Sequence, residues 1–329
     1  MTTKMMKRIL QTAAFVAATS LATPAHAQFN GENLLGDMGV KSGTQPEPGT
    51  YISTMYYRYF ADSIKAADGT MSLEANQTIN AGVPLVIYVS PKKIFGAHYG
   101  LMAVMPFANG SLEASAFGLS ETASTGPSDL YVMPAQLGWH LRRADITTGF
   151  AFFAPTGRHE AGASDNLGKG MWSYEVSGGG TAYLDKQRSL SISTMAYWET
   201  HTKKNGEVQF QRTTVHDVKV GQLLTLEGGI GKSFLHGAAS IGAAYYAQWK
   251  MTPDQMEFGS AAPQLSIPDK HRVFGYGPDI TIPIATKSKL IALVNARYLW
   301  ETGAQIKTQG QSLVITTTFP VGGIKIPSR

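Results

Sequence analysis

The chain has 329 residues, of which 28 are Lys or Arg and 23 are Asp or Glu, and it contains no cysteine. The absence of cysteine excludes disulfides, thiolate metal sites and a lipid-anchored N-terminal cysteine. The basic residues are not gathered in one stretch, so the positive balance does not predict a nucleic-acid-binding surface.

The first 27 residues have the pattern of a secretory signal peptide. Lys4, Lys7 and Arg8 precede a mostly apolar run at 9–22, and the small-x-small motif Ala-His-Ala ends at residue 27. A membrane-spanning helix is the alternative, but the run is shorter than the roughly 20 residues that such a helix needs. Because the signal carries three bases and no acid, the mature chain would have 25 basic and 23 acidic residues, a net charge near +2.

Residues 28–49 contain Gly and Pro and show no clear strand pattern. We interpret this segment as a periplasmic lead or as a plug inside a barrel lumen. No Pro-, Ser- or charge-rich linker divides the remaining residues, 50–329, which are therefore predicted to form one barrel domain. No apolar run beyond the signal approaches the length of a membrane-spanning helix.

From residue 50 onward, segments with strand-like alternation are separated by turn residues. Their number, about twelve, is even, as in closed antiparallel bacterial barrels. The segments are 50–60, 77–89, 98–107, 129–141, 145–154, 172–184, 189–200, 213–226, 238–251, 272–284 and two strands within 289–319.

The clearest pattern lies at 289–319. Every second residue from Leu290 to Trp300 is apolar, whereas Asn295, Arg297 and Glu301 share the other face. A polar connector at 302–310 precedes a second alternating strand. One dry face and one wet face suit lipid outside and water inside, so we predict an all-β fold, a closed antiparallel transmembrane barrel of the bacterial outer-membrane type.

Short and long connectors alternate along the chain, as they do at the two rims of outer-membrane barrels. The long ones are 61–76, 108–128, 155–171, 201–212 and 252–271. The tryptophans fall near strand ends, which predicts interfacial girdles, with the first at the inner rim and the others at the outer rim. They are Trp139, Trp172, Trp198, Trp249 and Trp300.

The inward positions of these strands define a predicted lumen lining with both signs of charge and several tyrosines. One interpretation is that the charges form ion pairs that fill the barrel. The other is that the aromatic side chains leave a path on which a flat, weakly polar solute can stack. The set is Arg58, Gln136, His140, Glu175, Tyr183, Tyr197, Glu199, Tyr246, Gln248, Asp279, Asn295, Arg297 and Glu301.

No motif predicts a catalytic, cofactor or metal site. The eight histidines form no metal-binding pair at ligand spacing, and no nucleophile elbow or phosphate loop occurs. A lipid-hydrolysing barrel would need Ser and His facing outward near one rim, where the sequence is almost wholly apolar. The loop at 155–170 is rich in oxygen side chains, which suits a calcium site or, more simply, a solvated loop.

Several stretches resemble the outer-membrane proteins associated with the meta pathway of phenol degradation. The similarity covers nearly the whole mature chain and consists of strand and rim features. The stretches are 43–49 with Tyr51 and Tyr56-Tyr57-Arg58, 128–131 with 137–140, 153–157 through 165–166 to Trp172, 197–201, 226–234 and 297–301. The resemblance implies an outer-membrane barrel, encoded beside catabolic enzymes, that admits aromatic or other hydrophobic compounds. One departure is that ten residues follow Phe319, whereas such barrels commonly end on an aromatic residue.

We therefore predict an outer-membrane channel for passive uptake of a small hydrophobic or aromatic compound, without cofactor or bond-making. Its expected partners are outer-membrane lipid, lipopolysaccharide and the solute, and no nucleic acid. Two alternatives stay open: a barrel enzyme acting on lipid, and a structural or adhesive barrel whose lumen is plugged by 28–49. The solute, an open or plugged lumen and the oligomeric state are not specified by the sequence.

Overall fold

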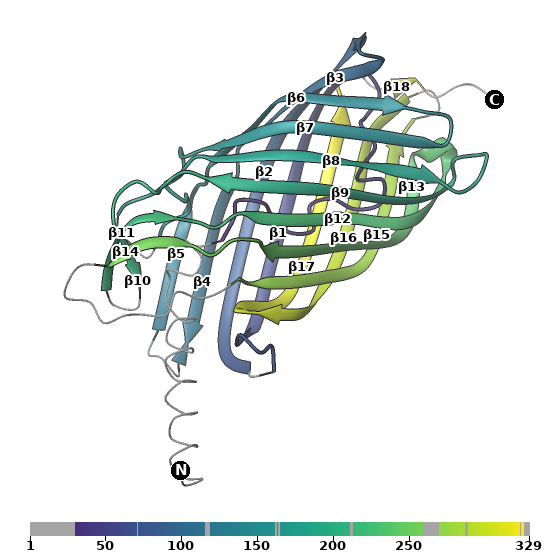
Figure 1. Ribbon diagram of the computed structural model, residues 1–329. Coiled ribbons are helices and arrows are strands. Elements are labelled where there is room, and N and C mark those ends of the chain that lie inside the picture. The colour runs from purple at the N-terminus through teal and green to yellow at the C-terminus, as the bar shows by residue number, and fades with distance from the viewer. Residues whose placement is uncertain are drawn as a thin grey trace.

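A computed structural model describes residues 30–70, 72–115, 119–161, 163, 165–210, 213–258, 270–286, 289–322 and 324–325 (Figure 1). The predicted signal peptide at 1–27 lies outside these residues. Within them, no helix is long and apolar enough to cross a membrane.

Twelve antiparallel strands form a closed ring, which confirms the predicted barrel. The ring closes where β1 pairs with β17 on one side and β2 on the other. In ring order the strands are β1 (Gly49–Lys65), β17 (Lys307–Pro320), β16 (Lys289–Gln305), β15 (Arg272–Ala285), β13 (Ala239–Lys250), β12 (Leu223–Phe234), β9 (Leu190–His201), β8 (Ser173–Tyr183), β7 (Ala144–Ala154), β6 (Leu130–His140), β3 (Ala97–Val104) and β2 (Ser72–Ile94).

The end of the ring that carries the long connectors, called the outer end below, has additional strand pairs that extend beyond the ring. Strand β2 has 23 residues and pairs first with β4 (Phe107–Ala114) and then with β3. Strand β5 (Leu119–Pro127) pairs with β4 and leads into β6. The predicted long connectors at 61–76 and 108–128 are therefore mostly strand. Their polarity reflects strands that rise beyond the apolar zone while keeping their ladder bonds.

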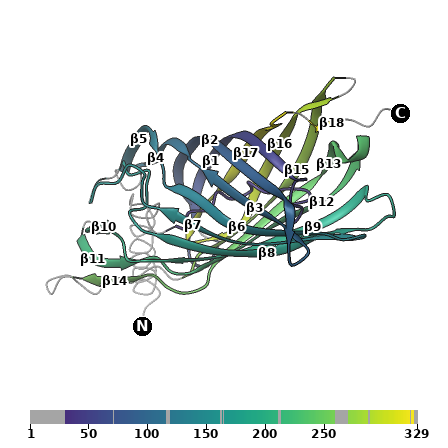
Figure 2. The same cartoon turned by 90° about the horizontal axis from the view of Figure 1, so that it is seen from above.

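A second, three-stranded sheet comes from the long loops at the same end of the barrel as β4 and β5, and Figure 2 shows it on the opposite side from them. It consists of β10 (Val208–Phe210), β11 (Thr213–Lys219) and β14 (Gln255–Phe258). The prediction of a spanning strand at 213–226 is thus wrong. Residues 213–219 belong to this outer sheet, and the next strand, β12, is the one that forms part of the barrel wall. The glycine-containing stretch at 228–231 lies inside β12.

The alternation of side chains follows the predicted rule along most of the ring. Outward positions expose large apolar side chains such as Ile52, Val176 and Ile230, which suits contact with lipid. The predicted connector at 302–310 is also wrong in extent, because β16 and β17 continue to a tight turn at Ile306, whose φ is 50°. Two short elements remain, η2 (Leu235–Gly237) and β18 (Ile324–Lys325), which pairs with β16.

Candidate functional site

The segment at 30–48 runs inside the ring of strands, and carboxylates on the barrel wall hold its backbone (Figure 1). The N–H of Glu32 donates to Glu199 Oε1 at 2.8 Å. The N–H groups of Gly36 and Met38 donate to the two carboxylate oxygens of Glu227, each at 2.9 Å. Each bond gives a partner to a backbone N–H that has no neighbouring strand, so these contacts fix the course of the segment.

A basic side chain of the barrel wall binds the same part of the segment through the segment's carbonyl groups. Arg297 on β16 donates to the carbonyl oxygens of Gly36 and Asp37. Its guanidinium also forms an ion pair with Asp279 of β15, Nε to Oδ2 3.0 Å, and both side chains are buried. Asn295 donates to Asp279 and accepts from Arg297, so the group is a connected polar network.

Nearer the short-turn rim, Asp145 of β7 collects several donors. It accepts hydrogen bonds from Thr44 of the segment at 3.0 Å and from Tyr183 at 2.5 Å. Arg188 pairs with it at 2.5 Å, and the Nδ1 of His140 lies 3.2 Å from it. The carboxylate is buried, so these partners replace the water that it loses. The segment is therefore anchored at both ends of its course.

Glycines on the barrel wall make room for the segment. A Cβ on Gly43 would lie 2.2 Å from the backbone of Gly180, so the backbone of the segment is in direct contact with the backbone of β8. Val40 packs against the glycines of β12 and β13, where a Cβ on Gly231 would meet it at 2.7 Å. Glycine inside a strand commonly marks such a close approach.

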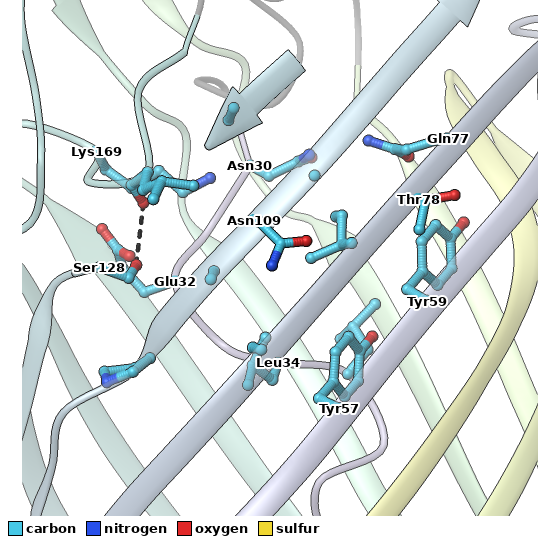
Figure 3. Close-up of a pocket in the computed structure, with 18 of the residues that line it drawn as sticks. Asn30, Glu32, Leu34, Tyr57, Tyr59, Gln77, Thr78, Asn109, Ser128 and Lys169 are labelled. Carbon is cyan, nitrogen blue, oxygen red and sulfur yellow. Dashed lines mark hydrogen bonds between the residues drawn. The ribbon is translucent and has the colours of Figure 1, made fainter. Parts of the chain in front are cut away.

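A cavity of about 300 Å³ lies in the outer part of the lumen, between the start of the segment and the extended strands (Figure 3). Its floor is apolar, because Leu34 of the segment packs, with Ile79 and Ala108, against a buried cluster that includes Tyr57 and Ala81. Lining residues also come from β4, β5, the loop after β7 and the first residues of β17. Figure 3 shows Tyr57 and Tyr59 side by side on one wall of this space.

Charged side chains, among them Glu301 and Lys307, also line the cavity. Glu301 accepts hydrogen bonds from Tyr59 at 2.8 Å and Tyr246 at 2.7 Å. Lys307 donates to Gln248 at 2.7 Å. The cavity can therefore hold an apolar ring against its floor while polar groups line its edge.

The predicted lumen residues, with one exception, lie on the inward face of the barrel. Gln248 and Glu301 line the cavity. Most of the others contact the segment at 30–48 or one another, which fits the ion-pair interpretation for these positions. Their role in a solute path remains a prediction. They are Gln136, His140, Glu175, Tyr183, Tyr197, Glu199, Tyr246, Gln248, Asp279, Asn295, Arg297 and Glu301.

The exception is Arg58, for which the prediction of a lumen position is wrong. Along β1 the exposed and buried residues alternate strictly, with Tyr57 and Tyr59 buried and Arg58 exposed on the outward face. A lumen position for Arg58 implies that its strand neighbours Tyr57 and Tyr59 face lipid, because side chains alternate along a strand. They face inward instead because the lumen here is filled by protein, and Leu34 packs on them.

Sequence reasoning missed Glu227 and Asp145. Glu227 was left out because the predicted strand ended at 226. Thr225, Glu227 and Ser233 are buried at alternate positions of β12, and this polar period-two pattern was the available signal. Asp145 stood at a predicted strand boundary, where the direction of a side chain is hard to assign.

The tryptophans lie close to strand ends, as predicted, although β16 continues five residues past Trp300. Trp172, Trp198 and Trp300 are exposed, and Trp300 contacts two tyrosines, Tyr276 and Tyr298. Trp139, near the short-turn rim, donates to the carbonyl of Phe95. Trp249 stacks edge-on against Phe274. Their function as interfacial girdles stays a prediction.

A Ser–His pair does occur, but it faces inward. Ser173 and His201 are paired across β8 and β9, with Nδ1 2.8 Å from Oγ, and both side chains are buried. Neither can meet a lipid at the barrel surface. Within the described ranges, no group of three or more His, Asp or Glu side chains could hold a metal ion.

The loop after β7 uses its oxygen side chains for turn contacts. Asn166 accepts from the N–H of Glu160 and donates to its carbonyl oxygen. Asp129 accepts the N–H groups of Gly157 at 2.9 Å and Lys169 at 2.6 Å. These bonds support the solvated-loop interpretation over calcium, with residues 162 and 164 outside the described part.

A family model described as "Putative MetA-pathway of phenol degradation" matches residues 61–317. Among solved structures, an outer-membrane channel from Pseudomonas putida F1 is similar, with a TM-score of 0.70, 14% identity, and 88% of this chain and 99% of that chain covered. The transport unit of the autotransporter AIDA-I from Escherichia coli has a TM-score of 0.49, 11% identity, and 94% and 97% covered. No curated protein matches the chain. The first likeness shows a shared outer-membrane barrel fold.

Proposed function

Because the chain belongs to this MetA-pathway phenol-degradation family, we propose that it is an outer-membrane channel for passive, down-gradient uptake of small hydrophobic or aromatic compounds. The observation that carries the proposal is the outer cavity of about 300 Å³, with its apolar floor and its tyrosines. A dry cavity of roughly 150 Å³ is enough to bind benzene, so a substituted single ring fits here.

The channel is proposed to work by binding and diffusion alone. Apolar solutes cross a lipopolysaccharide leaflet slowly, and a protein cavity that removes their apolar surface from water offers them another entry. The buried, inward Ser173–His201 pair supports a function without hydrolysis of lipid. The similarity in fold to an outer-membrane channel also supports a transport function.

The segment at 30–48 favours a second candidate, a structural barrel with a closed lumen. It forms hydrogen bonds with strands on both sides of the ring, so the lumen below the cavity is occupied by protein. In the channel proposal, this segment moves aside or leaves a passage beside it wide enough for a small ring. In the structural proposal it stays in place.

Uptake into liposomes that carry the purified, refolded protein distinguishes the two candidates. The solutes are phenol, toluene, a small sugar and potassium. The matched variants are Ala81→Trp, which fills the cavity floor, and Val86→Trp, which adds the same bulk on the outward face of the same strand. The channel proposal expects aromatic flux well above that of the sugar and the ion, lost in Ala81→Trp and kept in Val86→Trp. Equal, background flux for every solute would instead support the closed barrel.

A further inference from the structure

Two neighbouring tyrosines on β1 use their hydroxyl groups differently. The Tyr59 hydroxyl contacts Glu301 Oε2 at 2.8 Å and Thr308 Oγ1 at 2.9 Å. The Tyr57 hydroxyl forms no hydrogen bond with any residue in the described part of the chain, although its side chain is only 5% exposed. Tyr57 lines the cavity, and Figure 3 shows both rings on the same wall.

The hydroxyl oxygen of Tyr57 is not among the fully buried side-chain atoms that lack a partner, so it opens onto the cavity and can donate to or accept from a molecule there. Tyr246 and Tyr131, which also face inward, already bond to the carboxyl groups of Glu301 and Glu175. The uncommitted hydroxyl of Tyr57 is thus available to a molecule in the cavity. Only a small group on that molecule needs to be polar, because the neighbouring floor is apolar.

The rest of the lining narrows the chemistry of that molecule. Leu34, Ile79 and Ala81 offer an apolar surface beside Tyr57, which suits the face of one ring. The charged residues of the lining are four acids and two bases, a formal excess of negative charge. They are Glu32, Glu121, Asp129, Glu301, Lys169 and Lys307. A neutral solute is therefore favoured over an aromatic carboxylate.

We propose that Tyr57 is a specificity-determining residue of the channel. Its hydroxyl hydrogen-bonds the hydroxyl of a neutral, single-ring aromatic solute and so selects that solute over a hydrocarbon of the same size and over an aromatic acid. This inference rests on the proposed transport function. One uncharged hydrogen bond made in a dry site corresponds to a preference of roughly threefold to tenfold.

The test measures binding first and flux second. Phenol, toluene and benzoate are titrated against the full-length protein in detergent micelles, with empty micelles correcting for partition into detergent. The variants are Tyr57→Phe, which removes the uncommitted hydroxyl, and Tyr59→Phe, which removes a hydroxyl already bonded inside the protein. Heat-modifiable migration on gels checks that each barrel has folded, and Tyr57→Leu replaces the first variant if it has not.

The wild-type protein is expected to bind phenol threefold to tenfold more tightly than toluene and to bind benzoate most weakly. Tyr57→Phe should lower phenol binding to the toluene level and leave toluene unchanged, whereas Tyr59→Phe should keep the preference. The same phenol-to-toluene ratio in wild type and Tyr57→Phe, or equal loss in both variants, overturns the proposal. Binding needs no passage through the lumen. Absent flux with an intact binding preference would therefore sink the channel function and leave the role of Tyr57 standing as a binding role.

Discussion

The Oε1 atom of Glu227, in the middle of β12, accepts a hydrogen bond from the backbone N–H of Gly36 at 2.9 Å, across 191 positions of sequence. The second carboxylate oxygen makes the equivalent bond with Met38. The centre of the lumen is thus occupied by a segment whose backbone is held by side-chain carboxyl groups of the barrel wall. These bonds are directional and few, so removing one carboxyl group should change how firmly the lumen is filled.

Replacing Glu227 with Ala should loosen the segment and increase ion passage. The substitution removes two hydrogen bonds from backbone N–H groups, each contributing about 0.5–1.5 kcal/mol. Single-channel conductance in planar bilayers is expected to rise above the wild-type value, with more frequent large openings. Glu257→Ala, on the exposed side of the outer sheet, is the control and should conduct as wild type does. Identical conductance in all three proteins would show that Glu227 does not hold the obstruction.

Replacing Arg297 with Ala should lower the stability of the barrel, whereas replacing Arg58 with Ala should not. Removing Arg297 leaves the buried carboxylate of Asp279 without its cation and frees two carbonyl groups of the segment. Breaking a buried pair from one side costs about 3–5 kcal/mol. Arg297→Ala should therefore lower the urea midpoint of unfolding, followed by tryptophan fluorescence in detergent. Arg58 is exposed on the outward face, so Arg58→Ala should leave the midpoint unchanged. A larger loss in Arg58→Ala would mean that the two faces of β1 are assigned the wrong way round.

The barrel could be predicted because its rule is local. In β16 the inward positions Asn295, Arg297 and Glu301 alternate with apolar ones, and the structure keeps that alternation. The same rule failed at Arg58 because it assumes that the lumen holds water. Where the lumen holds protein, the inward face can be as apolar as the outward one, and polarity no longer distinguishes them. Tyr57 and Tyr59 are the residues that show this.

The cavity and the course of the segment could not be predicted from the sequence. The segment has no periodicity because its backbone bonds go to side chains of distant strands, such as Glu227 and Glu199, and not to a neighbouring ladder. The volume of the cavity depends on where Leu34 comes to rest against β1 and β2. Contacts between residues far apart in the sequence produce no pattern within a short stretch of it. The sequence therefore indicated that a plug was possible but not where it runs.

The outer loops carry a pH-dependent contribution to stability at Lys204, between β9 and β10. Its side chain is buried, and its Nζ donates to the carbonyl oxygen of Lys169 at 2.6 Å. Burial first, and the charge of Lys169 second, lower the pKa of Lys204 to about 7. In the unfolded chain the pKa of a lysine is near 10.4. Between these two values the unfolded chain therefore binds more protons than the folded one.

It follows that the free energy of unfolding should rise with pH from about 7 to about 10, by up to about 1.4 kcal/mol per pH unit from this one group. Below pH 7 both states hold the proton and the slope from Lys204 vanishes. Thermal unfolding followed by circular dichroism should show a rising midpoint over that window, and Lys204→Met should flatten it. Lys203→Met is the matched control, because Lys203 is exposed and pairs with Asp217 at the surface, so its profile should follow the wild type. Parallel profiles for wild type and Lys204→Met would mean that Lys204 is hydrated and titrates as an ordinary lysine, and that the loops cover it less closely than their hydrogen bonds indicate.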